Sequence, residues 1–279
     1  MAQTQCSQAV NTARDYYNSG DADNFYYTIW GGEDIHIGLY QTPDEDIAQA
    51  SRRTVETMAS RLQGLAETSR VLDMGAGFGG AARWLAKKHG CRVTALNLSQ
   101  VQNQRDRQMN REQGLDHLVE VVDASFEEVP CADGSFDFIW SQDAILHSGD
   151  RGKVMDEVSR LLKPGGQFVF TDPMAADDCP EGVLQPILDR IHLENLGSPG
   201  FYQEALARRG LKDLGFREHT DHLVNHYARI LEETQCREGE ICNAVSQDYI
   251  DRMKKGLSHW VEGGKQGHLA WGIFHFEKS

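Results

Sequence analysis

A glycine-rich segment, Val71–Gly80, carries the residues with the clearest potential for chemistry. Its sequence, VLDMGAGFGG, follows a short apolar stretch and precedes a helical pattern. Glycines permit positive φ angles and let the backbone approach a ligand closely, while the start of a helix offers free N–H groups. Asp73 stands two residues before the first glycine, where a carboxylate would repel a diphosphate but attract an ammonium group. The segment therefore favours a ligand with a cationic head group.

The spacing of the glycines also distinguishes this segment from a dinucleotide-binding turn. In the motif GxGxxG the third glycine comes one residue later than Gly79 does here, although Gly80 makes the distinction imperfect. A lone GxGxG pattern also occurs in tight turns that bind nothing. Ligand contacts within the segment are expected from Asp73, Gly75, Gly77 and Gly79.

Polar residues follow the next two predicted strands as well. Asn97 stands where nucleotide-binding folds place an acidic residue on the ribose hydroxyls, and its amide can still donate to and accept from a diol. The Asp123 carboxylate could accept from an adenine amino group, and its alternative role is to cap a loop. For the nucleoside part of a ligand the expected contacts are Asn97, Leu98, Gln102, Asp123, Ala124, Ser125 and Ser141.

A carboxylate and an imidazole follow the fourth predicted strand in the sequence SQDAILHS. The carboxyl ends of parallel strands face the ligand crevice, so this loop is expected to reach it. Asp143 and His147 are four residues apart and share one face if the loop enters a helical turn. Such a pair could orient and deprotonate a substrate, whereas the alternative is a purely structural histidine.

Strands and helices alternate through the middle of the chain, with Gly and Pro between them. This alternation implies right-handed crossovers and a parallel sheet covered on both faces. After Pro173 the rhythm of the strands is lost, and helices predominate. Strands are predicted at 70–74, 91–98, 118–122, 136–140, 167–172, near 215–220 and at 269–277. Helices are predicted at 44–65 (with Thr42-Pro43 as the start signal), 79–90, 100–113, 153–162, within 180–222, and at 224–233 and 248–265.

Together, the residues from Arg70 to Pro173 resemble class I S-adenosylmethionine-dependent methyltransferases. The turn LLKPGG, at 161–166, is typical of that class before the fifth strand. The resemblance implies a Rossmann-like α/β fold with a seven-stranded, mostly parallel sheet and helices on both faces. An antiparallel hairpin at one edge would come from the strand near residue 216 and the terminal strand. The implied cofactor is S-adenosyl-L-methionine, with S-adenosyl-L-homocysteine as its product.

Four segments are similar to the small-amine N-methyltransferases, which act on phosphoethanolamine or on glycine and its methylated derivatives: residues 16–17, 25–38, 140–148 and 271–274. In the phosphoethanolamine enzymes a tyrosine of an N-terminal lid pairs with a histidine over the reacting amine. The matching residues are Tyr17 and His147, with Tyr16 as the alternative tyrosine. Together with Asp143, Tyr17 and His147 form the expected catalytic set. The resemblance implies substrate contacts from Tyr26, Trp30, Gln142 and Trp271.

Three short motifs look closest to the sarcosine/dimethylglycine N-methyltransferases, which form glycine betaine: 97–99, 141–147 and 171–173. The resemblance implies an N-terminal lid at 1–66 and a catalytic domain at 67–279, with a helical cap at about 174–212 and 222–266. One alternative is a phosphoethanolamine, other small-amine or carbon methyltransferase. Alternatives from another class are a non-catalytic nucleotide-cofactor-binding protein and an NAD-dependent enzyme.

The composition and the net charge limit which classes of partner the protein can have. The formal net charge of −14 argues against nucleic acid and against an anionic membrane surface, since both select Lys and Arg. It indicates a well-solvated surface or adaptation to high salt. No apolar run reaches the length of a membrane helix, residues 1–20 lack a signal-peptide core, and a cytoplasmic location is expected. The six cysteines form no CxxC pair, so no metal is expected. The sequence leaves monomer and homodimer open.

Overall fold

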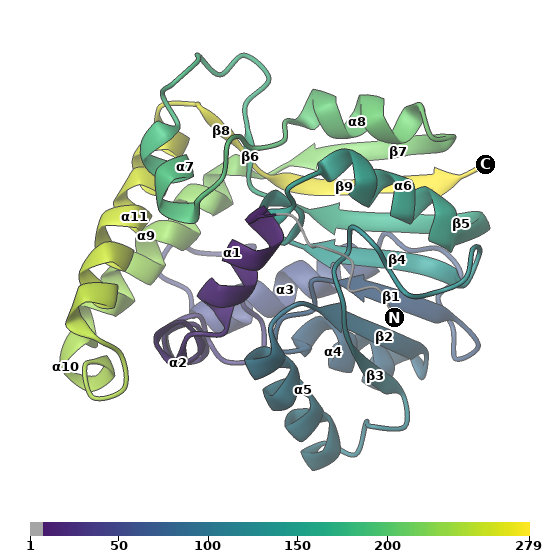
Figure 1. Cartoon of the computed structure of the whole chain (residues 1–279), viewed down its shortest axis with the longest axis horizontal. Helices are drawn as coiled ribbons and strands as arrows, with labels where there is room; N and C mark the ends of the chain where they lie inside the picture. Colours follow the sequence, from purple (N-terminus) through teal and green to yellow (C-terminus); the bar gives the residue numbers. More distant parts are fainter. Residues whose placement is uncertain (1–7) are drawn as a thin grey trace.

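A seven-stranded sheet forms the centre of the fold, in a computed structural model that describes residues 8–279 (Figure 1). Its strand order is β3-β2-β1-β4-β5-β9-β7, with β1 to β5 parallel and β9 antiparallel to both β5 and β7. This arrangement confirms the predicted sheet and its edge hairpin. The strands are β1 (Arg70–Met74), β2 (Arg92–Asn97), β3 (Val119–Asp123), β4 (Phe136–Gln142), β5 (Leu162–Thr171), β7 (Leu211–Glu218) and β9 (Gly272–Lys278).

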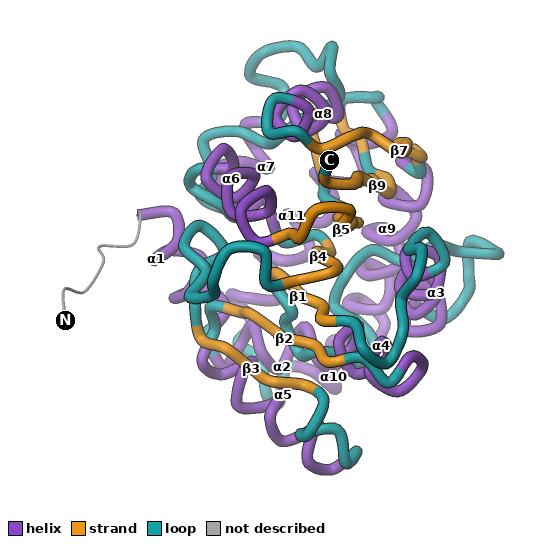
Figure 2. The backbone as a smooth tube through the Cα atoms, turned by 90° about the vertical axis from the view of Figure 1, so that its right-hand side faces the viewer, coloured by secondary structure: helices purple, strands orange, loops and turns teal. Residues whose placement is uncertain are grey.

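Helices cover both faces of the sheet (Figure 2). Alternation along each strand explains why both faces need cover: Val71 belongs to one buried apolar cluster and its neighbour Leu72 to the other. On β2, Val93 and Leu96 are divided between the clusters in the same way. The helices that cover the sheet are α3 (Ile47–Ala59), α4 (Gly80–His89), α5 (Gln100–Glu112), α6 (Arg151–Leu161) and α8 (Pro199–Ala207).

The remaining helices gather beside the carboxyl ends of the parallel strands (Figure 1). They come from the two ends of the sequence, with α9 packed along α11 and the N-terminal α2 in contact with α9. These helices are α1 (Gln8–Tyr17), α2 (Gly20–Ile29), α7 (Gln185–Ile191), α9 (Thr220–Cys236), α10 (Glu238–Ile241) and α11 (Gln247–Lys265). A 3-10 turn, η1 (Ile145–His147), and a two-stranded sheet of β6 (Met174–Ala175) and β8 (Leu269–Ala270) complete the fold.

Several predicted boundaries are wrong, each for a local reason. The helix predicted at 44–65 begins at Ile47, because the Asp46 side chain accepts from the N–H of Gln49 and caps it, and it ends at Ala59. The fifth strand begins at Leu162, which pairs with Phe136, while Gln167 pairs with Phe138, so the KPGG turn forms an irregularity within the strand. The terminal strand divides into β8 and β9 at Trp271.

The described residues contain no helix that combines enough length and hydropathy to cross a membrane. Within the same part of the chain, no group of three or more His, Cys, Asp or Glu side chains is arranged to hold a metal ion. Cys6 lies outside the described residues, and the other five cysteines are free thiols.

Candidate active site

The glycine segment forms a turn between β1 and α4 that only glycine accommodates. Gly75 and Gly77 have φ angles of 85° and 57°, in the left-handed region. The N–H of Gly75 donates to the carbonyl of Leu96 at 2.8 Å, which fixes the turn against β2. A Cβ on Gly75 would lie 2.3 Å from that of Ala144, so the turn also packs directly on the loop after β4. The turn therefore presents bare backbone to the cavity beside it.

This glycine cavity has a volume of about 90 Å³ and takes its lining from the loops after β1, β2, β3 and β4. Six of the residues predicted to bind the nucleoside ligand line it: Gly75, Gly77, Asn97, Leu98, Gln102 and Ser125. Asn97 Nδ2 donates to Gln102 Oε1 at 3.0 Å, so the two amides form one polar edge. Tyr17, Gln142, Asp143 and His147, predicted for other roles, line it too, and the lining residues that the sequence did not single out for any role are Ile35, Ser99, Phe126 and Ala144.

Other residues predicted for the same role do not line the glycine cavity. Ser141 Oγ donates to the carbonyl of Met74 at 2.7 Å and joins two strands instead. Gly79 packs on Asp106, because a Cβ there would lie 2.1 Å from the Asp106 Oδ1. The Asp123 carboxylate turns away from the cavity and accepts from the side chains of Asn103 and Arg107 on α5. Ala124, next to Asp123, is likewise absent from the lining.

Asp73 lies buried beneath the glycine turn rather than on the cavity surface. Its Oδ2 is fully buried and has no hydrogen-bond partner among the described residues. Burial, followed by the nearby carboxylates of Asp106 and Asp34, raises the pKa of Asp73 to about 8. Arg83 pairs with Asp106 at 2.7 Å and Arg52 pairs with Asp34, whereas Asp73 has no such partner in the described part of the chain. An unpaired buried carboxylate beside a bare-backbone cradle fits a ligand with a cationic head group.

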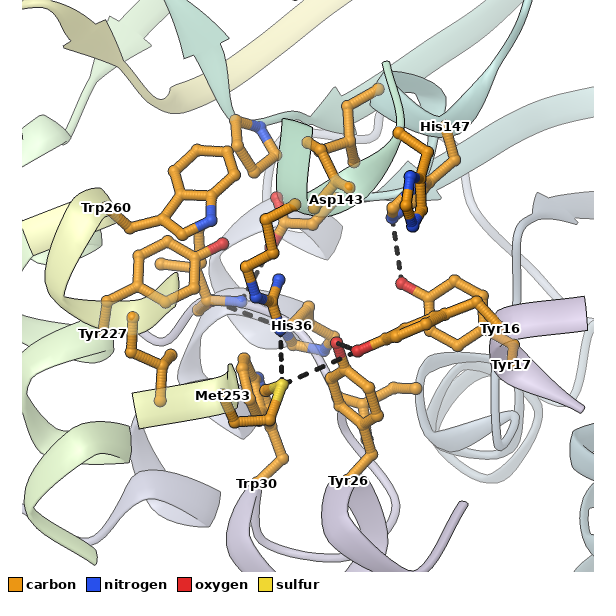
Figure 3. Close-up of a pocket in the computed structure, with 18 of the residues that line it drawn as sticks. Tyr16, Tyr17, Tyr26, Trp30, His36, Asp143, His147, Tyr227, Met253 and Trp260 are labelled. Atoms are coloured by element: carbon orange, nitrogen blue, oxygen red, sulfur yellow. Dashed lines mark hydrogen bonds between the residues drawn. The ribbon is translucent and has the colours of Figure 1, made fainter. Parts of the chain in front are cut away.

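A second cavity, which we term the aromatic cavity, adjoins the first and has a volume of about 80 Å³ (Figure 3). A cavity of this size has room for water or for a small molecule. Tyr26 of α2 and Trp30 directly after that helix, which are expected to contact the substrate, line this cavity with ring centroids 4.8 Å apart. Among residues 8–279, four line both cavities: Tyr17, Ile35, Asp143 and His147. These four mark the place where ligands in the two cavities would meet.

Tyr17 and His147 form a hydrogen bond at this junction (Figure 3). The Tyr17 hydroxyl, at the end of α1, lies 2.9 Å from Nε2 of His147 on η1. Burial, helped by the positive charges of Arg151 and Arg190, lowers the pKa of His147 to about 4. Burial also raises the pKa of the Tyr17 hydroxyl. At neutral pH the pair therefore consists of an uncharged imidazole and an uncharged phenol.

Asp143 and His147 do not form the shared helical face that their spacing suggested. The turn begins only at Ile145, and Asp143 before it has a φ of 50°, which turns its side chain elsewhere. Asp143 Oδ2 accepts from the N–H of Ile37 at 2.7 Å, and Oδ1 accepts from the indole of Trp271 at 2.8 Å. Burial raises the pKa of this carboxyl group. Both side chains still line the aromatic cavity, but each is held there by different hydrogen-bond partners.

Two residues predicted to touch the substrate have other positions. Trp271 is fully buried and absent from the cavity lining, because its indole lies behind Asp143 and donates to it. Gln142 lines the glycine cavity rather than the aromatic cavity. Side chains two residues apart on a strand share a face, and Gln142 Oε1 accepts from the indole of Trp140 at 2.9 Å. Both residues support the site from its strand side.

The cap contributes lining residues that the sequence did not single out as site residues. Tyr227 from α9 and Trp260 from α11 stack with ring centroids 5.1 Å apart, and both line the aromatic cavity. Arg190 from α7 and Met253 from α11 join them. His36, in the segment after α2, also lines the cavity. Nothing in the local pattern of the helical cap marked these positions, since each is brought to the cavity by packing between distant helices.

A buried histidine next to the aromatic cavity makes the stability of the protein dependent on pH. His226 Nδ1 accepts from the N–H of Gly38 and from the Tyr40 hydroxyl, and its ring packs on Trp30. Burial lowers the pKa of His226 to about 3. An unfolded histidine titrates near 6.5, so between the two values the unfolded chain binds more protons than the folded one. This contribution to folding is intact above about pH 6.5 and declines as the pH falls towards 3.

We expect His226→Asn to flatten the acid side of the stability profile. The asparagine carbonyl can replace Nδ1 as acceptor, but it does not bind a proton in the unfolded chain. Between pH 4 and 6 the slope of unfolding free energy against pH should fall by about 1.4 kcal/mol per pH unit, the value for one proton. Urea titrations at a series of pH values measure the slope, with the exposed His117→Asn as the matched control. An unchanged slope in His226→Asn would contradict the assignment.

Comparison with known proteins identifies the family. Residues 72–170 match the model of the family described as a methyltransferase domain. The chain is 62% identical to the sarcosine/dimethylglycine N-methyltransferase of Halorhodospira halochloris, covering all of both chains. It is 54% identical to the enzyme of the same name from Aphanothece halophytica, covering 99% of each. A crystal structure from Galdieria sulphuraria, described provisionally as a sarcosine dimethylglycine methyltransferase, superposes with a TM-score of 0.90 at 46% identity, covering 95% of this chain and 99% of that one. This chain therefore belongs to the sarcosine/dimethylglycine N-methyltransferase family.

Proposed function

We propose that this chain transfers methyl groups from S-adenosyl-L-methionine to sarcosine and N,N-dimethylglycine, giving glycine betaine. The observation that carries the proposal is the junction of the two cavities at Tyr17, Ile35, Asp143 and His147. A methyl donor in the glycine cavity and an amine in the aromatic cavity would meet there. Positioning two reactants in this way supplies a large part of the catalysis of a displacement.

The residues of the glycine cavity fit the donor. When bound, S-adenosylmethionine supplies a methyl group on a positively charged sulfur. Asn97 and Gln102 would hold the ribose hydroxyls through their amides, and Ser125 and Phe126 would contact the adenine. The unpaired Asp73 carboxylate beneath the turn would balance the charge of the α-ammonium group. A diphosphate would find no cation in this cavity, since its lining contains no Lys or Arg among the described residues.

The residues of the aromatic cavity fit a small amine whose nitrogen gains charge. The nitrogen must have a free electron pair before it can attack the methyl carbon, and it carries a positive charge afterwards. His147, uncharged and hydrogen-bonded to Tyr17, can accept the proton that a protonated amine must lose. Asp143 stabilises the positive charge of the new ammonium group, and the faces of Tyr26 and Trp30 add cation–π contacts.

We also propose that the helices outside the sheet act as a lid at 1–66 and a cap at about 174–212 and 222–266. The side chains that these helices place in the aromatic cavity support the proposed lid and cap: α1 provides Tyr17, α7 provides Arg190 and α11 provides Trp260. A cytoplasmic location is part of the proposal, supported by the free thiols among the described cysteines.

Turnover of a panel of amines tests the function. Purified protein is incubated with S-adenosylmethionine and sarcosine, dimethylglycine, glycine or phosphoethanolamine, and formation of S-adenosylhomocysteine is followed while the product is identified by NMR. We expect turnover with sarcosine and dimethylglycine, and betaine as the end product. Turnover of phosphoethanolamine without turnover of dimethylglycine would overturn the proposal. Calorimetric titration with S-adenosylmethionine and NAD separates a methyltransferase from an NAD enzyme, because only the first should bind.

A further inference from the structure

Arg190 stands out in the aromatic cavity as a cation without an anion. It is the single Lys or Arg among the described residues that line this cavity. Its Nε is fully buried and lacks a hydrogen-bond partner in the described part of the chain, and no described carboxylate lies within ion-pair distance of it. The residue as a whole is partly exposed, but its buried Nε has lost water without gaining a hydrogen-bond partner, so the guanidinium favours an anion that the described protein does not supply.

Inside the aromatic cavity, the Arg190 guanidinium contacts a thioether and neighbouring phenols rather than carboxylates. One Nη contacts the thioether of Met253, which is drawn as a dashed line in Figure 3. The neighbouring phenols include Tyr16 and Tyr26, and burial raises the pKa of Tyr26 further above its usual value, so it stays neutral. The electrostatic effect of the positive charge on Arg190 extends to the junction of the cavities, where it helps to lower the pKa of His147. The cavity therefore offers a cation at Arg190 and, at a separate place, the Asp143 carboxylate.

The packing of α11 leaves room specifically for this guanidinium. Gly256 lies in the middle of the helix, where glycine is less favourable than alanine. A Cβ on Gly256 would lie 2.0 Å from Nε of Arg190 and 2.1 Å from its Cδ. The arginine therefore lies against bare helix backbone, and an alanine at 256 would displace it. On the same helix, a Cβ on Gly263 would make ordinary contacts, with Leu269 at 3.4 Å as the nearest.

Arg190 also lines a second hollow, an outer groove of about 730 Å³ that shares Tyr16, His192 and Met253 with the aromatic cavity. Positive and titratable side chains gather there, although the chain as a whole carries a formal charge of −14. The groove includes Arg190, His192, Arg252, Lys255 and His259, against Asp21 and Asp189. A local cluster of positive charge attracts small anions and raises their local concentration. Arg190 thus lines both the aromatic cavity, where the amine would react, and a larger groove that contains further positive side chains.

We propose that Arg190 binds the carboxylate of the amino-acid substrate and makes the enzyme select amino acids over uncharged amines. The proposal rests on the proposed function and names the group that holds the far end of its substrate. A guanidinium forms charge-assisted and often bidentate hydrogen bonds with a carboxylate. Arg190, Asp143 and His147 line the same cavity of about 80 Å³, so a carboxylate at Arg190 would place the amine of dimethylglycine in the cavity that these other two side chains also line. An uncharged analogue of the same shape would leave the arginine unpaired, and such a loss gives strong discrimination.

The test compares dimethylglycine with N,N-dimethylethanolamine, which has a hydroxymethyl group in place of the carboxylate. Arg190→Met should raise KM for dimethylglycine at least about tenfold with little change in kcat, because uniform binding is lost. It should leave kcat/KM for dimethylethanolamine nearly unchanged, so the preference between the two amines collapses. Arg190→Lys should recover part of the preference, since it keeps the charge without the planar fork.

Gly256→Ala provides a test that leaves the arginine in the sequence. Gly256→Ala should raise KM for dimethylglycine, as Arg190→Met does. Gly263 is the matched glycine on α11, and Gly263→Ala should keep the wild-type KM. Calorimetric affinity for S-adenosylmethionine verifies that each variant is folded. An unchanged KM in Arg190→Met, or an equal loss with both amines, would overturn the proposal. If wild-type protein turned over neither sarcosine nor dimethylglycine, the proposed function itself would fail, which is a distinguishable result.

Discussion

Asp143→Asn is expected to lower kcat/KM for dimethylglycine by about 1000-fold, the scale observed when one preorganised electrostatic group is removed. The carboxylate lies at the junction of the two cavities, and both of its oxygens accept N–H hydrogen bonds, from Ile37 and Trp271. These donors fix its position and favour its ionised form. Asparagine keeps the size but removes the charge that would stabilise the new ammonium group. Steady-state rates and calorimetric binding of S-adenosylmethionine measure the two effects separately.

A second variant separates the lost charge from a lost fit. An asparagine has one acceptor oxygen, so its NH₂ group would face one of the two donors. Removing the indole donor with Trp271→Phe relieves that conflict while the Ile37 donor remains. We expect Asp143→Asn with Trp271→Phe to regain folding stability over Asp143→Asn alone, but not turnover. Trp271→Phe alone keeps the charge and should retain activity within about tenfold. Recovery of turnover in the double variant would show that the carboxylate acts only by packing.

The sequence predicted the sheet and the glycine turn well because both depend on local patterns. Apolar runs separated by Gly and Pro marked β1 to β5, and positive φ angles at Gly75 and Gly77 match the residue type that permits them. The predicted ends of helices and strands were less accurate where a side chain outside the periodic pattern determines where the element begins or ends. Asp46, rather than Thr42-Pro43, starts α3 because its carboxylate caps the helix. The turn before β5 was recognised, but its inclusion in the strand depends on pairing with β4.

The candidate site was harder to predict, because side chains of successive residues on a strand point to opposite faces. A shift of one residue therefore decides whether a side chain reaches the cavity. Trp271 was expected to contact substrate but lies behind Asp143. Asp123 ends β3 as expected, yet its carboxylate turns to Arg107. Arg190 and Tyr227 reach the aromatic cavity only through packing of cap helices that are far apart in the sequence. No local periodicity encodes such a contact, whereas the family resemblance did indicate Tyr17 and His147 together.

The hydrogen-bonded pair of Tyr17 and His147 leads to the second prediction of large effect. His147→Ala is expected to lower kcat by about 100- to 1000-fold, within the range for loss of a general base. His147→Gln keeps an acceptor or donor near the Tyr17 hydroxyl but has no basic nitrogen, so it should be nearly as slow. Affinity for S-adenosylmethionine should remain nearly intact, since His147 is one of many residues that line the glycine cavity. Full activity of His147→Ala would make the histidine purely structural.

A double-mutant cycle shows whether the two residues act as a unit. Tyr17→Phe removes the hydroxyl and keeps the ring, and should lower kcat by about 10- to 100-fold. If the phenol acts by orienting the imidazole, adding Tyr17→Phe to His147→Ala should cost little more, because groups that act together are strongly non-additive. Tyr16→Phe on the same helix is the matched control, since the Tyr16 hydroxyl bonds to Tyr249 at 2.8 Å rather than to His147. Purely additive losses would mean that Tyr17 contacts the substrate independently of the imidazole.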